Sequence, residues 1–273
     1  MQLILNADDL GYSPGVNEAI LTLYQAGLLS SASLIVNLPH SPAAIALART
    51  AGLPTGVHLN LTRGRPCLPT KTVPSLVTAD GAFYASPTFY ARALSGLVRP
   101  AEVDAECRAQ IDHALAGLGR VTHLDSHSHW HLVPSLRPVV EQLARDYDVG
   151  CVRTADPRRT LYPNALWLAT LAATPVPAGR PFRSDYMLSL HHWLDDDATP
   201  IPLLSGRRVC DLLGRSPVTV ELVTHPGRAA DPDFPFDTLP ADRRQRECDF
   251  LLGPAFSRWL QVVGADVSQP VNL

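Results

Sequence analysis

Residues 3–36 read LILNADDLGYSPGVNEAILTLYQAGLLSSASLIV, and this stretch decides the fold class. A short apolar run from Leu3 to Ala7 ends at two aspartates, as a buried strand does when it enters a loop. The pair Ser13-Pro14 is typical of a helix start, and apolar residues at helical spacing follow from Val16 to Leu29. Ala32 to Val36 predicts a second strand. This order predicts parallel strands joined by crossover helices.

The same alternation continues along the chain. Further strands are expected at residues 55–61, 121–126, 150–154 and 218–224, and further helices at residues 42–51, 100–118, 134–146, 166–172, 209–213 and 243–263. Six or seven parallel strands with crossover helices predict an α/β fold, a single-domain distorted (β/α) barrel. We expect one domain over residues 1–273, with an irregular stretch at 63–86 and an irregular insertion at about 156–202.

Composition excludes several classes of protein. Hydrophobic residues make up 46% of the 273 residues and charged residues 18%, which is the balance of a globular protein. The net charge of −3 and the absence of a dense Lys or Arg run argue against a nucleic-acid partner. A homodimer is an arrangement that the sequence leaves open.

The cysteines and the apolar segments indicate a compartment. Five cysteines are odd in number and include no CxxC pair, which argues against a disulfide framework and against a four-cysteine zinc site. No stretch reaches the roughly 18 apolar residues of a membrane span, and Met1 is not followed by a basic segment and a long apolar core of a signal peptide. We therefore expect a cytoplasmic protein without a membrane span.

Aspartate and histidine gather where predicted strands end. The segments are Asn6-Ala7-Asp8-Asp9, Val57-His58-Leu59-Asn60, His123-Leu124-Asp125-Ser126-His127-Ser128-His129-Trp130-His131 and Thr224-His225-Pro226. The carboxyl ends of parallel strands open on one face of such a fold, where the loops form a site. Four separate segments therefore deliver these side chains to one rim.

The histidine-rich run after residue 122 carries the strongest signal. It holds four histidines and one aspartate in nine residues, which are costly to bury without a cation or a proton-transfer role. Alternation along a strand places His123, Asp125 and His127 on one face, and His129 with them if the strand extends that far. Two imidazoles and one carboxylate from separate strands have the composition of a catalytic metal site rather than of a closed structural one.

Other interpretations of the single residues stay open at this point. Asp8 and Asp9 before a glycine also suit turn and N-cap chemistry, and His58 alone suits a hydrogen-bonded core histidine. His225 before a proline suits a loop residue equally well. The pair His191-His192, inside the irregular insertion, is expected at the surface.

Six segments together resemble the YdjC-like carbohydrate deacetylases, which include the diacetylchitobiose (chitooligosaccharide) deacetylases. They are Asn6-Ala7-Asp8-Asp9-Leu10-Gly11, Ser31-Ala32-Ser33, Gly56-Val57-His58-Leu59-Asn60-Leu61-Thr62, Thr122-His123-Leu124-Asp125-Ser126-His127-Ser128-His129, Val152-Arg153 and Thr224-His225-Pro226, in the order of the family, from residue 2 to about residue 227. Leu10 stands where phenylalanine is common, and residues 155–216 match poorly. The substrate is therefore what the resemblance leaves undetermined.

The resemblance implies a barrel of the glycoside hydrolase/deacetylase type and a metal site. Its ligands fall on Asp9, His58 and His127, and Asp8 falls on the position of the catalytic base. His225 matches the C-terminal histidine of the family, which we interpret as a general acid. The cofactor is then one divalent metal ion, with Mg²⁺ implied by the family and Zn²⁺ favoured by the two imidazole ligands.

Four further residues are expected to bind substrate or to support the ligands. They are Asn60, Asp125, His129 and Arg153. Arg153 ends its own predicted strand, where its guanidinium could pair with Asp8 or Asp125 and keep the carboxylate ionised.

The expected activity is metal-dependent removal of N-acetyl groups from an amino sugar or chitooligosaccharide, with a small N-acetylated carbohydrate as partner. The alternatives are a deacetylase of a glycosylated lipid, as in a hopanoid-associated branch of the family, and another metal-dependent hydrolase. A phosphoesterase would need a second metal, for which Asp125 and His129 are candidate ligands. A carbohydrate-binding protein without turnover is the non-enzymatic alternative.

Overall fold

The computed structural model describes residues 2–153, 184, 186–192, 194, 219–235, 239–263 and 266–267. Its strands are β1 (Gln2–Leu10), β2 (Ser31–Leu34), β3 (Thr55–Leu59), β4 (Leu124–Ser126), β5 (Tyr186–Ser189), β6 (Thr219–Thr224) and β7 (Asp266–Val267). Its α-helices are α1 (Pro14–Gln25), α2 (Ser41–Ala51), α3 (Ser86–Leu94), α4 (Pro100–Leu118), α5 (Arg137–Asp146), α8 (Ala241–Leu252) and α9 (Pro254–Val263). The 3-10 turns are η1 (Thr70–Thr72), η2 (His127–Leu132) and η3 (Leu190–His192).

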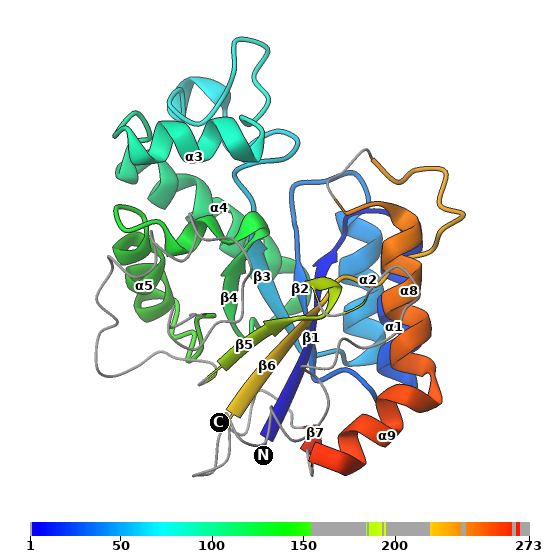
Figure 1. The fold of residues 1–273 in the computed structure, drawn as a ribbon. Coiled ribbons are helices and arrows are strands. Elements are labelled where there is room, and N and C mark those ends of the chain that lie inside the picture. The colour runs from blue at the N-terminus through cyan, green and yellow to red at the C-terminus, as the bar shows by residue number, and fades with distance from the viewer. Residues whose placement is uncertain are drawn as a thin grey trace.

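All these strands belong to one parallel sheet. Its order is β4-β3-β2-β1-β6-β5, and β7 pairs with the first residues of β1. The sheet curls into a half-barrel with helices around it (Figure 1). Among the described residues β4 and β5 do not pair with each other, so the barrel is open between them. The expected distorted barrel of six to seven parallel strands is confirmed.

The central strand β1 organises the core. Residues 3–10 are all buried, with β2 along one edge and β6 along the other. The continuous apolar start Leu3-Ile4-Leu5 suits a strand that is covered on both faces. The helix α1 follows it, and the Ser13 hydroxyl accepts a hydrogen bond from the Val16 backbone N–H at 3.3 Å. This cap, with Pro14 in the first turn, is the helix start that the sequence predicts.

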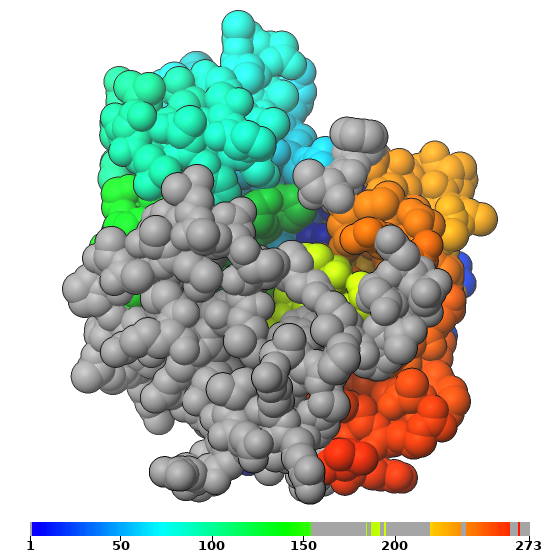
Figure 2. All heavy atoms as spheres, viewed as in Figure 1, coloured from blue at the N-terminus to red at the C-terminus, as the bar shows by residue number. Residues whose placement is uncertain are grey.

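The stretch at 63–86 is irregular as expected. All of it is described, and it contains η1 and one antiparallel bridge between Val77 and Phe83. Two carboxylates of α4 stabilise it: Glu102 accepts from the Ser75 backbone N–H at 2.7 Å, and Glu106 accepts from two further backbone N–H groups. These bonds satisfy backbone N–H groups that would pair with a neighbouring strand in a regular sheet. The helix α3, which sequence patterning missed, continues this stretch into a lobe that stands out from the body (Figure 2).

Two expected elements differ in the structure. Within residues 150–153, the described part of the strand expected at 150–154, the structure has one parallel bridge from Val152 to Leu124 of β4. The single helix at 243–263 is two helices, α8 and α9, because Gly253 is extended and Pro254 cannot continue the hydrogen-bond ladder.

Part of the insertion expected at 156–202 is ordered. Residues 186–189 form β5, which pairs in parallel with β6, so this part contributes to the sheet instead of being irregular. The helices expected at 166–172 and 209–213 lie outside the described residues. Within the described part of the chain, no helix is both long and apolar enough to cross a membrane.

Gly56 in β3 gives a first test of this packing. A Cβ at this position would lie 2.4 Å from three atoms of the buried His123 ring, whereas a Cβ at Gly150 would meet nothing within 4 Å. We expect Gly56→Ala to lower the free energy of unfolding by about 1–3 kcal/mol through overpacking, and Gly150→Ala to change it by less than about 0.5 kcal/mol. Urea denaturation of both variants measures this difference. Equal midpoints for the two would show that His123 does not pack against Gly56.

Candidate active site

The carboxyl ends of β1, β3, β4 and β6 meet at one rim, and the predicted polar side chains lie there. Asp8, Asp9, His58, Asp125 and His127 are all buried, and His225 is half-buried. Figure 2 shows a hollow between the α3 lobe and α8, with atoms of the N-terminal segment (dark blue) at its floor. The prediction that four separate segments converge on one rim is confirmed.

A β-bulge directs two consecutive aspartates into the same site. Ala7 pairs with Ala32 and Leu10 with Leu34, so β1 has one residue more than β2 in this interval. In a regular strand Asp8 and Asp9 would point to opposite faces. Asp9 instead has a φ of 68°, the left-handed region, which aspartate adopts more readily than most residues. His58 Nε2 consequently lies 3.8 Å from Asp8 Oδ2 and 3.4 Å from Asp9 Oδ1.

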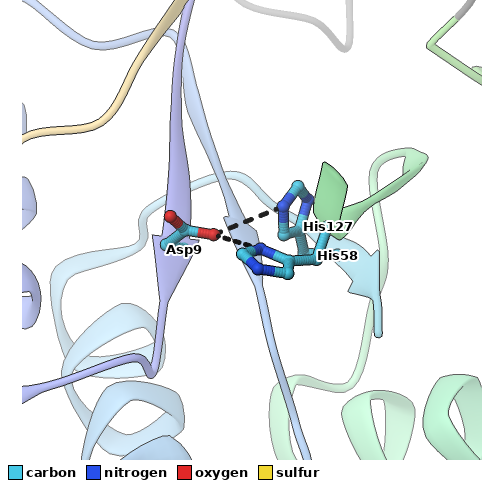
Figure 3. A group of neighbouring side chains, drawn as sticks. All are labelled: Asp9, His58 and His127. Carbon is cyan, nitrogen blue, oxygen red and sulfur yellow. Dashed lines mark hydrogen bonds and ion pairs between the residues drawn. The ribbon is translucent and has the colours of Figure 1, made fainter. Parts of the chain in front are cut away.

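Asp9, His58 and His127 form a compact group (Figure 3). One oxygen of Asp9, Oδ1, lies 3.4 Å from His58 Nε2 and 3.0 Å from His127 Nδ1. One ligand atom from each residue lies within 4.8 Å of the other two. The second Asp9 oxygen, Oδ2, accepts from the Arg244 guanidinium at 2.7 Å. This bond leaves Oδ1 directed at the two imidazoles.

The donor set and its surroundings fit a divalent cation. His58 Nδ1 lies 2.7 Å from Asp125 Oδ1, so this carboxylate orients the ring with Nε2 toward Asp9. Metal-binding histidines commonly have such an outer carboxylate. Burial by itself lowers the pKa of His58, but Asp125 and Asp8 outweigh it and raise the pKa to about 10. The centre therefore has a negative potential that favours a cation.

Arg153 holds three carboxylates together. Its two terminal nitrogens donate to the two Asp8 oxygens at 2.7 Å each, and its Nε donates to Glu221 at 2.9 Å. One terminal nitrogen also lies 2.8 Å from Asp125 Oδ2. Arg153 is 0% exposed, so these contacts are made in a low-dielectric interior. Burial opposes ionisation of Asp8, but Arg153 outweighs it and lowers the pKa of Asp8 to about 2.

Polar side chains of neighbouring strands complete the support. Ser33 of β2 donates to Asp125 at 2.6 Å and lies 3.0 Å from His123 Nε2. Asn6 donates to Asp8 at 2.7 Å and to Ser33 at 2.8 Å. The Asn6 and Ser33 motifs that carry the family resemblance thus hold the carboxylates in place.

His225 lies near the same Asp8 oxygen as His58. Its Nε2 lies 3.9 Å from Asp8 Oδ2, and its ring centroid is 5.1 Å from that of His191. Glu247 of α8 fixes its backbone by accepting from the His225 N–H at 2.7 Å and from the Thr224 hydroxyl at 2.6 Å. Burial outweighs the nearby carboxylates and lowers the pKa of His225 to about 4.

Two of the predicted supporting residues, Asn60 and His129, have other neighbours as their main contacts. Asn60 organises the loop after β3, because its side-chain amide donates to Asn37 and its oxygen accepts from the Thr62 and Arg63 backbone N–H groups. His129 is buried with its ring 6.4 Å from that of His131. Its φ of 56° follows from the tight turn of η2, which interrupts the strand alternation assumed for it.

Four functional neighbours were not predicted from the sequence. They are Glu221, Arg244, Glu247 and His191. Alternation along β6 places Glu221 and His225 on one face and could have indicated the first. Arg244 and Glu247 lie on a helix whose other residues are ordinary surface and core residues, so no local pattern marks them. His191, expected at the surface, is half-buried against His225.

Comparisons with known proteins cover this whole site. A family model described as YdjC-like protein matches residues 2–262. The carbohydrate deacetylase of Brevibacillus brevis is 35% identical over 233 residues, which are 83% of this chain and 81% of that protein. The carbohydrate deacetylase of Mus musculus is 29% identical, with 98% of this chain and 93% of that protein covered.

A solved structure has the same fold. It is a protein of Enterococcus faecalis V583 described as a candidate cellobiose-phosphate cleavage protein, with a TM-score of 0.79 and 25% identity. The superposition covers 99% of this chain and 98% of that one.

Glu247 gives a test of the burial at this site. Burial raises its pKa from 4.5 to about 7. The protonated carboxyl therefore contributes its full stability below about pH 4.5, and this contribution is lost as the pH rises through about 7. One pKa unit corresponds to about 1.4 kcal/mol, so the free energy of unfolding should fall by roughly 3 kcal/mol over this range. Glu247→Gln should flatten the pH dependence of the unfolding free energy between these values.

Urea denaturation of the chelator-treated protein at several pH values measures this effect. Glu18→Gln, at an exposed glutamate, is the matched control and should keep the wild-type dependence. A Glu247→Gln variant that keeps the wild-type slope would contradict the burial of an ionisable group at this position.

Proposed function

The chain belongs to the YdjC-like protein family, and from this premise we propose that it is a carbohydrate deacetylase that hydrolyses N-acetyl groups of an amino sugar or chitooligosaccharide. The observation that carries the proposal is the arrangement around Asp8. A group that suits a divalent cation and a neutral histidine both approach this carboxylate, with His58 Nε2 3.8 Å and His225 Nε2 3.9 Å from Asp8 Oδ2. Amide hydrolysis needs both an activated water and a proton for the leaving nitrogen.

Asp9, His58 and His127 are the residues that would hold the cation. Two imidazoles and one carboxylate leave positions for water and substrate, as catalytic sites do. When bound, such a cation supplies Lewis acidity, which activates water and polarises a carbonyl. Asp125 and Arg244 orient the ligands from outside, through His58 Nδ1 and Asp9 Oδ2.

Asp8 and His225 move the proton. Water adds to the acetyl carbonyl carbon and loses a proton to Asp8; the C–N bond then breaks, and the nitrogen leaves as an amine after protonation. Both groups are unprotonated at neutral pH, since their pKa values are about 2 and about 4. The proton that reaches the amine therefore originates on the attacking water.

The pKa order supports transfer from Asp8 to His225. A carboxylate whose pKa is about 2 keeps a proton only briefly, and the more basic His225 imidazole lies 3.9 Å from it. His225 then donates to the leaving nitrogen and returns to its neutral form. The second proton of the attacking water also ends on the amine, so the products are acetate and the amino sugar in its ammonium form, and atoms and charge balance.

The two-metal phosphoesterase alternative is not favoured. It requires a carboxylate that bridges two metals about 3.5–4 Å apart. Asp125, the candidate for a second ligand set, is already bonded to His58 and to Arg153, whose guanidinium occupies the space between Asp8 and Asp125. A second cation there would meet this guanidinium.

A screen for acetate release tests the activity. The full chain is incubated with N-acetylglucosamine, diacetylchitobiose and longer chitooligosaccharides, with and without added Mg²⁺ or Zn²⁺. We expect equal amounts of acetate and free amine from at least one of them. Absence of acetate with every substrate, although metal is bound, would overturn the proposal.

Asp8 and His58 should separate catalysis from metal binding. Asp8→Asn removes the carboxylate that accepts the proton, so the turnover rate should fall about 10²–10⁴-fold while bound metal is retained. His58→Ala removes a ligand and should reduce the bound metal itself. Elemental analysis beside acetate assays distinguishes them, with the exposed Asp242→Asn as control. Metal loss in Asp8→Asn with metal retention in His58→Ala would invert the two roles.

His225 should matter most when the leaving group needs a proton. His225→Ala should slow amide substrates about 10²-fold or more and should slow activated acetyl esters much less, because a good leaving group departs without protonation. The ratio of the two kcat values, before and after substitution, measures this. Equal losses on both substrates would assign His225 to substrate positioning instead.

A further inference from the structure

A second group of potential ligands includes His225 itself. His191 of η3, His225 after β6 and Glu247 of α8 each provide one ligand atom within 4.8 Å of the other two. These residues come from three elements that are distant in sequence, and the His191 and His225 rings are in edge contact. The group shares no residue with Asp9, His58 and His127.

Two buried atoms of His225 and Glu247 are available to a ligand. Glu247 Oε1 and His225 Nδ1 are both buried and have no hydrogen-bond partner among the described residues. The other Glu247 oxygen is bonded to Thr224 and to the His225 backbone, which holds the carboxylate in place. His191 Nδ1 lies 2.8 Å from the Ser189 hydroxyl, a contact that orients its ring as outer hydrogen bonds orient metal-binding histidines.

Leaving a buried carboxylate oxygen and a buried imidazole nitrogen without partners is costly. A cation bound between them would satisfy both. Glu247 is 1% exposed, so its oxygen is not solvated from outside.

A shallow cavity leads from the surface to the group. His191, Leu194, Arg243, Arg246 and Glu247 line it. The two arginines repel cations, so this group should bind a cation more weakly than the Asp9 group does. They also favour an anion, such as hydroxide or acetate, as an additional ligand at the open position.

We propose that His191, His225 and Glu247 form a second, weaker divalent-cation site that prefers Zn²⁺ and that inhibits the enzyme when it is occupied. Two imidazoles and one carboxylate suit Zn²⁺ better than Mg²⁺, which prefers oxygen ligands. Mg²⁺ should therefore leave this site empty.

The inhibition rests on the proposed function of His225. A neutral imidazole that binds a cation through Nδ1 carries its proton on Nε2. Its Nε2 then has no lone pair to accept a proton from Asp8, which lies 3.9 Å away. Occupation of the second site therefore stops proton transfer to the amine while the first site stays loaded.

Zinc stoichiometry tests the site without any need for turnover. Equilibrium dialysis of the full chain against rising Zn²⁺, followed by elemental analysis, should give one tightly and one weakly bound ion per chain. His191→Ala should keep the tight ion and lose the weak one, whereas His58→Ala should lose the tight one. The exposed His113→Ala is the matched control and should bind both.

Glu247→Gln provides a second variant, because its side-chain oxygen can still accept from Thr224 while the charge is lost. It should bind the weak ion at least about tenfold less tightly. A single zinc ion in the wild type, or two in both His191→Ala and Glu247→Gln, would overturn the proposal.

Acetate release at rising Zn²⁺ then tests the inhibition. The rate of acetate release by wild type and by His113→Ala should fall about tenfold or more as the weak site fills. The rate of His191→Ala should fall less than about twofold over the same zinc concentrations. Two bound zinc ions without acetate release from any substrate would support the second site and overturn the deacetylase function. Acetate release with only one bound zinc ion would support the deacetylase function and overturn the second site. Equal inhibition of all three proteins would refute the inhibitory role.

Discussion

The buried guanidinium of Arg153 is the interaction on which the site depends. Asp8, Asp125 and Glu221 all contact it, and none of the four groups reaches solvent. Removing so much charge from water costs several kcal/mol per ion, and only mutual pairing with short, well-directed hydrogen bonds offsets this cost. Because the pairing keeps Asp125 ionised, Asp125 can orient His58, and the geometry around Asp9 follows from that orientation.

The bulge in β1 gives two neighbouring aspartates separate tasks. Asp8 faces Arg153 and His225, and Asp9 faces His58, His127 and Arg244. A regular strand would have placed one of these carboxylates behind the sheet. The strained φ of Asp9 is tolerable because its side chain is bonded on both oxygens and because β2 and β6 hold the strand on both edges.

The helix α8 ties the C-terminal part of the chain to the same site. Arg244 lies against the neighbouring rings of Tyr12 and Phe234, with its guanidinium carbon 5.2 and 5.3 Å from their centroids, and it donates to Asp9. One turn later Glu247 fixes the backbone of His225. A single helix therefore positions a candidate metal ligand and the candidate proton carrier together, which couples the two halves of the proposed reaction.

The sequence by itself determined the alternation of strands and helices, the open parallel barrel and the convergence of Asp8, Asp9, His58, His127 and His225 on one rim. These follow from local periodicity and from the rule that parallel strands end on the same side. The pairing of Arg153 with Asp8 or Asp125 was also expected, and the structure contains both contacts. Only the tertiary structure decided the other partners of those residues. Arg244, Glu247 and His191 come from segments without a distinguishing local pattern, and β5 lies inside a stretch that appeared irregular. The physical reason is that the pKa and pairing of a buried charge depend on the groups around it, and the pairs Arg153–Glu221, Arg153–Asp8 and Arg244–Asp9 each join residues more than 60 positions apart.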